Sequence, residues 1–232
     1  MSANRGDYMR FQGGDYGKYR DELQDKVHDV LTRNAIKYII GISGDADVTQ
    51  QLRTEGLVEA FIETIKQHPC AVLTGGTKGG VPQIGVEIAK RHGIPRIGVF
   101  PQQGHKYALW NELDIAIETT PPDMGEGTFG TETPTFVNLL DAATIIGGSY
   151  GTLTEVTTIL KTNVKRLADA KRYPESVVRP PIYIAPISGT GGAADHAHEI
   201  ARVFGRGADT TLPQQPIASG AEAAAFILEK LN

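Results

Sequence analysis

The sequence predicts an α/β fold in which a doubly wound parallel sheet carries helices on both faces. Three observations lead to this fold class. Short apolar runs of strand length alternate with segments whose apolar residues recur at helical spacing. A glycine-rich turn follows several of these runs. The chain has 232 residues without an internal shift in composition, which predicts a single domain. Because parallel strands need crossovers, the alternation favours a parallel sheet.

Each element follows from its local pattern. The apolar runs place strands at residues 36–40, 71–73, 97–100, 114–118, 142–146 and 182–185. The run at 114–118 alternates polar and apolar residues, so we expect a less buried strand there. Helical spacing predicts helices over 21–34, from about 47, between Pro82 and Gly93, over 134–140, from 152 to about 170, up to about 204, and from near 219.

Two segments depart from this rhythm. Residues 1–20 lack apolar periodicity and are expected to form a flexible N-terminal arm, so that the domain covers residues 21–232. A loop from Thr119 to about Thr131 is long enough to suggest a function. Its acidic residues favour a flexible acidic loop over a cation site.

Composition narrows the possible partners. The formal net charge is -4 with both signs interspersed, so we expect no nucleic-acid partner. No stretch reaches the length of a membrane span, and the polar start has no signal-peptide core, so we expect no membrane partner. The one cysteine, Cys70, suits a buried strand start and a reducing compartment. A cytoplasmic protein without a metal or cofactor is therefore predicted.

Glycine clusters at 41–44, 75–80, 147–151 and 189–192 all follow predicted strands, so they should converge at one edge of the sheet. Glycine turns that lead into helices present backbone N–H groups to an anion such as a phosphate. None of these turns matches the G-x-G-x-x-G or P-loop pattern. The expected ligand contacts are Gly41, Ser43, Gly44, Gly75, Gly76, Thr77, Lys78, Gly79, Gly80, His105, Gly147, Gly148, Ser149, Tyr150, Gly151, Thr152, Ser188 and Gly189.

Glu155 has two interpretations. The spacing from Thr152 to Glu155 is typical of a capping box, in which both side chains satisfy the first N–H groups of a helix. Alternatively, the carboxylate faces the sugar of a bound nucleotide, where it could bind a hydroxyl or stabilise an oxocarbenium-like transition state. His105 is either a ligand contact or an exposed loop residue.

Residues 147–155 resemble the P-G-G-x-G-T-x-x-E motif of the LOG proteins. With residues 74–80, they make the chain similar to the SLOG superfamily of Rossmann-like nucleotide-binding domains, from about residue 36 to 230. Residues 73–77, 127–132 and 188–191 resemble more closely the SLOG domains of TRPM channels and their prokaryotic relatives. This resemblance implies an adenosine nucleotide or ADP-ribose-like ligand and a possible sensor.

The resemblance also implies an alternative activity. LOG enzymes hydrolyse the N-glycosidic bond of nucleoside 5′-monophosphates and pair the motif glutamate, here Glu155, with an arginine. The aligned position here holds Glu132, so an arginine such as Arg96 or Arg166 would have to take that role. LOG-like proteins are typically dimers, which implies a homo-oligomer. The sequence therefore predicts a nucleotide-binding protein, with a phosphoribohydrolase and an assembly module as alternatives.

Overall fold

The computed structural model describes residues 7–10, 25, 27, 29, 31–33, 35–47, 50–119, 129–176 and 178–232. Within these residues, seven strands form one sheet in the order β1-β5-β4-β3-β2-β6-β7, and every neighbouring pair is parallel. The strands are β1 (Asp7–Arg10), β2 (Tyr38–Gly44), β3 (Cys70–Thr74), β4 (Arg96–Pro101), β5 (Ile115–Thr119), β6 (Ala142–Ile146) and β7 (Tyr183–Pro186). The predicted α/β class and parallel sheet are confirmed.

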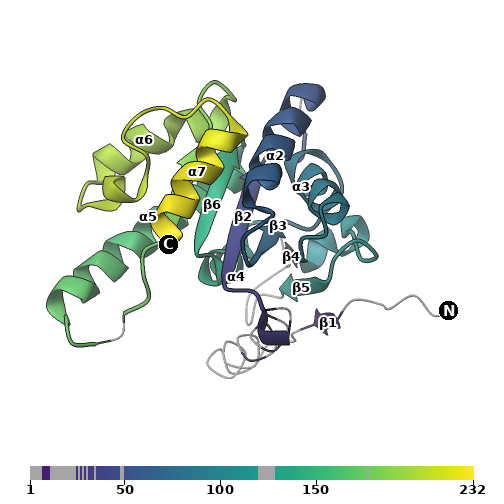
Figure 1. The fold of residues 1–232 in the computed structure, drawn as a ribbon, viewed down its shortest axis with the longest axis horizontal. Coiled ribbons are helices and arrows are strands. Elements are labelled where there is room, and N and C mark those ends of the chain that lie inside the picture. Colours follow the sequence, from purple (N-terminus) through teal and green to yellow (C-terminus); the bar gives the residue numbers. More distant parts are fainter. Residues whose placement is uncertain are drawn as a thin grey trace.

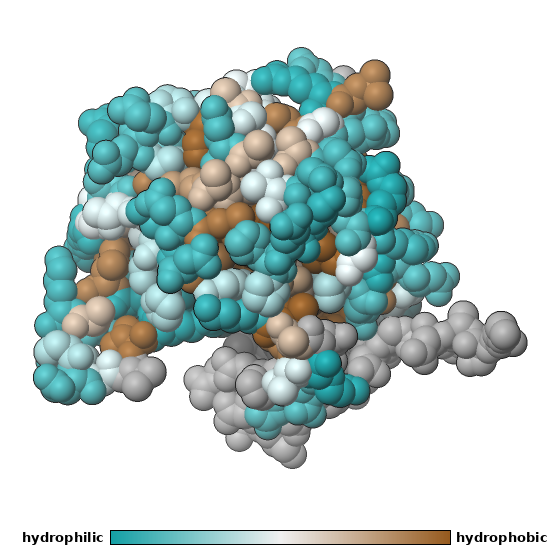
Figure 2. Space-filling view, viewed as in Figure 1, coloured by the Kyte–Doolittle hydropathy of each residue, from teal (hydrophilic) through white to brown (hydrophobic). Residues whose placement is uncertain are grey.

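Helices cover both faces of this sheet (Figure 1). One face packs against α2 (Gln51–Ile65), α3 (Gly80–Arg91) and α7 (Gly220–Leu231), and the other against α4 (Thr133–Leu139), α5 (Tyr150–Arg172) and α6 (Gly192–Phe204). Two short 3-10 helices, η1 (Gln102–Tyr107) and η2 (Ala208–Thr211), complete the described elements. The face drawn in Figure 2 is mostly hydrophilic, with scattered hydrophobic patches between the polar residues. The apolar faces of the helices therefore lie in the core.

The strand order has a switch point at β2. From β2 the chain builds outward through β3, β4 and β5, then returns to place β6 on the other side of β2. The connections that leave the carboxyl ends of β2 and β6 therefore diverge to opposite faces of the sheet. In open α/β sheets, ligands bind in the crevice that this divergence creates.

Three sequence expectations differ from the structure. Residues 7–10, expected in a flexible arm, form β1 and pair in parallel with β5; the rest of 1–20 lies outside the described residues. The expectation of a less buried strand at 114–118 is wrong, because all five residues of β5 are buried between β1 and β4. Helix α2 begins at Gln51 instead of near Asp47. Residues 120–128 of the long loop are outside the described part of the chain.

Candidate functional site

A cavity of about 480 Å³ lies at the switch point, where the segments after β2, β6 and β7 meet. Two of the four predicted glycine clusters reach it, those at 147–151 and 189–192. Its lining residues are Asp45, Asp47, Gln50, Arg53, Thr54, Leu57, Ile146, Gly147, Gly148, Gly189, Thr190, Gly191, Gly192 and Asp195. A second cavity of about 480 Å³ shares Gly148 and Gly192 with the first and also touches Ser149 and Tyr150. The start of α5 therefore lies between two hollows.

The turn before α5 can form only with glycine at position 148. Gly148 has φ 104°, and a Cβ atom there would lie 2.4 Å from the Cβ of the buried Thr152. Within the described residues, no side chain caps the helix at Ser149, and its first turn holds no acidic residue. The first N–H groups of α5 are consequently available to a ligand. At Gly151 an added Cβ would meet no atom within 4 Å, so this side of the first turn is exposed.

The glycine loop after β7 is arranged differently. The Asp195 carboxylate accepts hydrogen bonds from the N–H groups of Gly189 and Gly191, at 2.6 and 3.0 Å. It occupies the place that a ligand anion would take in this loop. The N–H groups of Ala193 and Ala194, in the first turn of α6, donate to the carbonyls of the 147–148 turn at 2.9 and 3.0 Å. These N–H groups are already bonded, so the loop shapes the cavity without offering them to a phosphate.

Protein groups also accept hydrogen bonds from several N–H groups of the loop at residues 75–80. The N–H of Gly76 donates to Thr74 Oγ1 at 3.0 Å, that of Lys78 to the Tyr107 carbonyl at 2.8 Å, and that of Gly79 to Gln83 Oε1 at 2.8 Å. The N–H of Val81 donates to the Asp45 carbonyl at 2.8 Å. The sequence predicts a phosphate-binding loop here. In the structure these hydrogen bonds connect the loop to η1 and α3.

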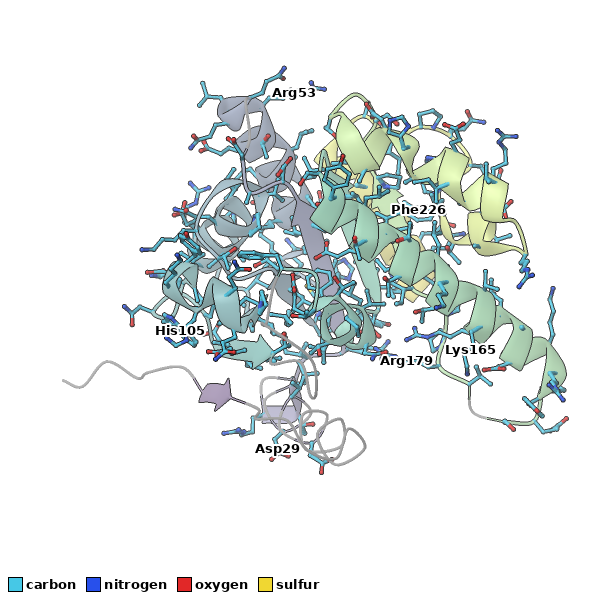
Figure 3. The ribbon with its side chains drawn as sticks, turned by 180° about the vertical axis from the view of Figure 1, so that it is seen from behind. Asp29, Arg53, His105, Lys165, Arg179 and Phe226 are labelled. Atoms are coloured by element: carbon cyan, nitrogen blue, oxygen red, sulfur yellow. The ribbon has the colours of Figure 1, made fainter. Side chains whose placement is uncertain are left out.

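Sequence reasoning missed the cation of the cavity, which is Arg53 in the first turn of α2. Its guanidinium lies 3.6 Å from where a Cβ on Gly189 would stand, and it donates a hydrogen bond to Gln50 Oε1 at 3.3 Å. Figure 3 shows Arg53 at one end of the molecule, far from Lys165 and Arg179. Like α5, α2 has no side-chain cap and no acidic residue in its first turn. A cation just after the switch-point strand is the signal that could have identified it.

Three carboxylates share the cavity with Arg53. Asp195 is held by the glycine loop, and Asp45 accepts a hydrogen bond from Ser149 Oγ at 3.3 Å, which bridges the two sides of the switch point. Asp47 is the third. Carboxylates accept hydrogen bonds but donate none when ionised, so they suit ligand hydroxyl or amino groups. The cavity thus has a cation that suits an anionic ligand group and carboxylates that suit hydrogen-bond donors of a ligand.

Glu155 lies in the second turn of α5 and accepts a short hydrogen bond from the Ser43 hydroxyl on β2. The capping-box interpretation is wrong, because the helix begins at Tyr150 and Thr152 is not its N-cap. Burial raises the pKa of Glu155 to about 7, against the bond from Ser43, and the neighbouring Glu132 carboxylate raises it further. Burial also raises the pKa of Glu132, which accepts a 2.7 Å bond from the Gly130 N–H.

The arginines considered as partners of Glu155 are engaged elsewhere. Arg96 is the first residue of β4, so it lies at the amino ends of the strands, opposite the carboxyl ends where the cavity is. It forms a two-point ion pair with Asp114 at 2.8 and 2.6 Å. Arg166 donates to the Pro180 carbonyl at 2.8 Å, and burial lowers its pKa to about 10. The described charged group that acts on Glu155 is therefore a second carboxyl group, that of Glu132.

The other residues expected to contact the ligand have structural roles or lie outside the cavity. A Cβ at Gly41 would lie 2.7 Å from Leu140 Cδ2, and one at Gly44 would lie 2.3 Å from the Ile146 carbonyl oxygen, so both glycines allow close packing of β2. The Ser188 N–H donates to the Ile217 carbonyl at 2.7 Å. His105 Nδ1 lies 2.7 Å from an oxygen of the fully buried Glu118, which orients the imidazole. His105 is part of η1, which contacts β4 and β5, and it is not among the residues that line the switch-point cavity.

A family model describes 135 consecutive residues of this chain. The SLOG cluster4 family matches residues 37–171, which include β2, the turn before α5 and Glu155. The chain belongs to the SLOG cluster4 family. The predicted membership of the SLOG superfamily is confirmed. No curated protein matched this SLOG protein.

Solved structures share the fold of this SLOG protein at low sequence identity. The structural-genomics target TM1055 is 17% identical, with a TM-score of 0.60, over 84% of this chain and 99% of that one. The molybdenum cofactor binding protein of Rippkaea orientalis is 20% identical, with a TM-score of 0.57, over 84% and 97%. DNA processing protein A of Helicobacter pylori is 15% identical, with a TM-score of 0.51, over 87% and 84%. At these identities the likeness extends to the fold.

The prediction that nucleic acid is excluded as a partner is wrong. DNA processing protein A of Helicobacter pylori, which has this fold, binds single-stranded DNA. Net charge reports the average surface, whereas a binding crevice depends on a few local groups. Regarding membranes, no helix among the described residues has the length and apolarity needed to cross one.

Proposed function

We propose that this SLOG protein binds a small phosphate-bearing ligand, an adenosine nucleotide or ADP-ribose-like molecule, with a phosphate at the start of α5. The observation that carries the proposal is the uncapped helix N-terminus at Ser149, at the switch point of the sheet. Free N–H groups and the helix dipole favour an anion there. Gly151 in this first turn is exposed and has open space beside it, which supports access of a ligand to the start of the helix.

The lining of the adjoining cavity supports a ligand with sugar hydroxyl groups. Arg53 and the uncapped start of α2 favour a negative charge on one wall. Asp45 and Asp47 provide acceptors on another part of the lining. A nucleotide has the matching combination, because its phosphate is an anion and its ribose hydroxyls are donors. Sensing follows if binding changes the segments after β2 and β6, which this ligand would bridge.

Thermal unfolding with a ligand panel tests the proposal. The panel contains AMP, ADP, ATP, ADP-ribose, the molybdenum cofactor and a single-stranded oligonucleotide. At about a hundredfold excess over Kd, a ligand stabilises the fold by about 2.7 kcal/mol, which raises Tm by roughly 5–10 °C for a chain of this size. We expect adenosine nucleotides or ADP-ribose to give this rise. A response confined to the cofactor or oligonucleotide, or no response, would overturn the proposal.

The variant Arg53→Gln tests whether Arg53 contributes to ligand binding. Arg53 is exposed and its loss leaves the core unchanged, so the apo Tm should stay within a degree or two while Kd weakens about tenfold. Lys165→Gln is the control, because Lys165 is an exposed cation on α5 that Figure 3 places far from Arg53. Equal ligand affinity in both variants would remove Arg53 from the site.

The second candidate is N-glycosidic hydrolysis of nucleoside 5′-monophosphates. It is favoured by Glu155, whose pKa of about 7 would let the side chain exchange a proton near neutral pH. The nearby Glu132 opposes it, because a second carboxylate repels an anionic substrate. The activity predicts release of free base from AMP, abolished by Glu155→Gln. If base is not released, or is released equally by Glu155→Gln, this candidate is eliminated.

A further inference from the structure

We propose that Glu59, Glu63 and His92 form a binding site for a divalent transition-metal ion of the zinc class, on the surface where α2 meets the end of α3. The site is distinct from the switch-point cavity. One ligand atom from each residue can be chosen so that all three lie within 4.8 Å of one another. Imidazole nitrogen with carboxylate oxygen is a donor set that suits zinc.

The backbone fixes the three side chains on facing surfaces. Glu59 and Glu63 are four residues apart on α2, so they project from the same face one turn apart. His92 is the C-cap of α3 and is largely buried, with 18% of its side chain exposed. The ring therefore has little freedom, and it lies between the two carboxylates. Its Nε2 is 2.5 Å from Glu59 Oε1, and its Nδ1 is 3.4 Å from Glu63 Oε2.

The outer oxygens of both carboxylates are held by cations. Arg91 forms an ion pair with Glu59 Oε2, and Lys66 lies 2.5 Å from Glu63 Oε1. The inner oxygens, Oε1 of Glu59 and Oε2 of Glu63, are the ones that face His92. Metal-binding carboxylates are commonly oriented in this way by hydrogen-bonding groups of an outer shell. The ion pairs therefore position ligands for a metal.

The helix dipoles also favour a cation at this place. Glu63 is in the last turn of α2, and His92 follows the last residue of α3. Both helices thus direct the negative ends of their dipoles toward the site. A metal would replace the hydrogen-bonded proton between Nε2 and Oε1. Zinc bond lengths of 2.0–2.2 Å at a tetrahedral angle separate two ligand atoms by about 3.4 Å. The two atoms that lie 2.5 Å apart would therefore move about 1 Å away from each other, and a pair near the 4.8 Å limit would approach by up to about 1.4 Å. A water molecule would complete the four ligands.

Metal titration of the full chain tests the proposal. Zn²⁺ should bind with one equivalent per chain by calorimetry and raise Tm by roughly 5–10 °C at a hundredfold excess over Kd. Co²⁺ should bind in the same place and give visible absorption bands of a four-coordinate ion with nitrogen and oxygen ligands. Zn²⁺ should then displace Co²⁺ and remove these bands. Absence of saturable binding at micromolar metal would overturn the proposal.

Substitutions locate the ion. His92→Gln and, independently, Glu63→Gln should each weaken binding at least tenfold. Glu63 is exposed, so its replacement keeps the fold even where loss of the largely buried His92 ring destabilises it. The control is His196→Gln. His196 Nδ1 lies 3.9 Å from Glu199 Oε2 on α6, and this exposed pair lacks a third ligand among the described residues. If His196→Gln removes binding and His92→Gln does not, the ion binds elsewhere and the assignment is refuted.

Discussion

Gly151→Ala separates ligand binding from fold stability at the start of α5. Gly151 is the second residue of the helix, is exposed, and has an ordinary negative φ. An added Cβ would meet no atom within 4 Å, so alanine fits the folded chain. Alanine loses less backbone entropy than glycine on folding, which stabilises a helix by about 0.5–1 kcal/mol. For a chain of this size the apo Tm should rise by roughly 1–4 °C.

The same methyl group should weaken the ligand. It would stand on the exposed surface of the first turn of α5, next to the phosphate position that we propose. Hydrogen bonds to the phosphate need a donor–acceptor distance near 2.9 Å, and a methyl group at that position keeps the phosphate farther away. We expect Kd to weaken at least tenfold. The apo protein is therefore stabilised while the rise in Tm on adding nucleotide is mostly lost.

Gly56→Ala is the matched control for this experiment. Gly56 is an exposed helical glycine of α2, and a Cβ there would also meet no atom within 4 Å. This variant should gain a similar apo Tm and keep the full nucleotide response. Differential scanning fluorimetry of the three proteins, with and without ligand, measures both quantities. If Gly151→Ala keeps the whole nucleotide-induced rise, the phosphate does not bind at this helix.

Three further predictions concern stability. Glu155→Gln should be more stable than the parent at about pH 8, by up to about 3 kcal/mol, and nearly equal at about pH 4. The pKa of the folded Glu155 carboxyl is raised to about 7, so the parent loses stability as the pH rises from the ordinary carboxyl pKa to about 7. Asn163→Ala should lower Tm by roughly 5–15 °C, since the buried amide bonds both the N–H and the carbonyl of Ile182 at 2.7 Å, and each orphaned group costs about 1–3 kcal/mol. Ser219→Ala should cost about 1 kcal/mol by removing the capping box of α7.

Each of these has its own measurement. Urea unfolding across pH measures the Glu155 effect, and a stability difference that grows toward acid would contradict the assigned burial. Asn163→Asp tests the amide itself, because a carboxylate retains the acceptor and loses the donor to the Ile182 carbonyl. For the cap, Ser219→Thr should restore most of the loss, and an unchanged Tm in Ser219→Ala would show that the capping box contributes little.

The fold was predictable because hydrophobic periodicity decides which segments become strands and helices. The six strands expected from apolar runs all occur, with ends that differ from the expected ones by at most four residues. Strand β1 was not predictable, because its pairing with β5 depends on an edge that local sequence does not describe. The burial of β5 was misjudged for a related reason. Glu118 makes the strand alternate in polarity, but it is buried against His105, a partner distant in the chain.

The site was predictable in position and less so in composition. Turns after parallel strands meet at one edge, so the glycines at 147–148 and at 189 were correctly expected to converge. Arg53 was missed because it is not part of a glycine motif. It lines the cavity because α2 begins beside it, and the sequence alone does not show where that helix lies. Gly41 was expected at the ligand, yet a glycine inside a strand can equally serve close packing, as it does against Leu140.

Glycine-rich turns after strands become anion sites only where their N–H groups lack protein acceptors. The turn at 75–80 has the densest run of glycines, but Thr74, Tyr107 and Gln83 accept from its N–H groups, and Asp45 accepts from that of Val81, which follows it. At 189–191 the acceptor is a carboxylate, which already supplies the charge that a phosphate would bring. The start of α5 lacks such a side-chain cap within the described residues, and it is flanked by the two cavities. The presence or absence of protein acceptors therefore selects one phosphate position among similar sequence motifs. For this reason we expect a methyl group at Gly151 to affect ligand affinity most.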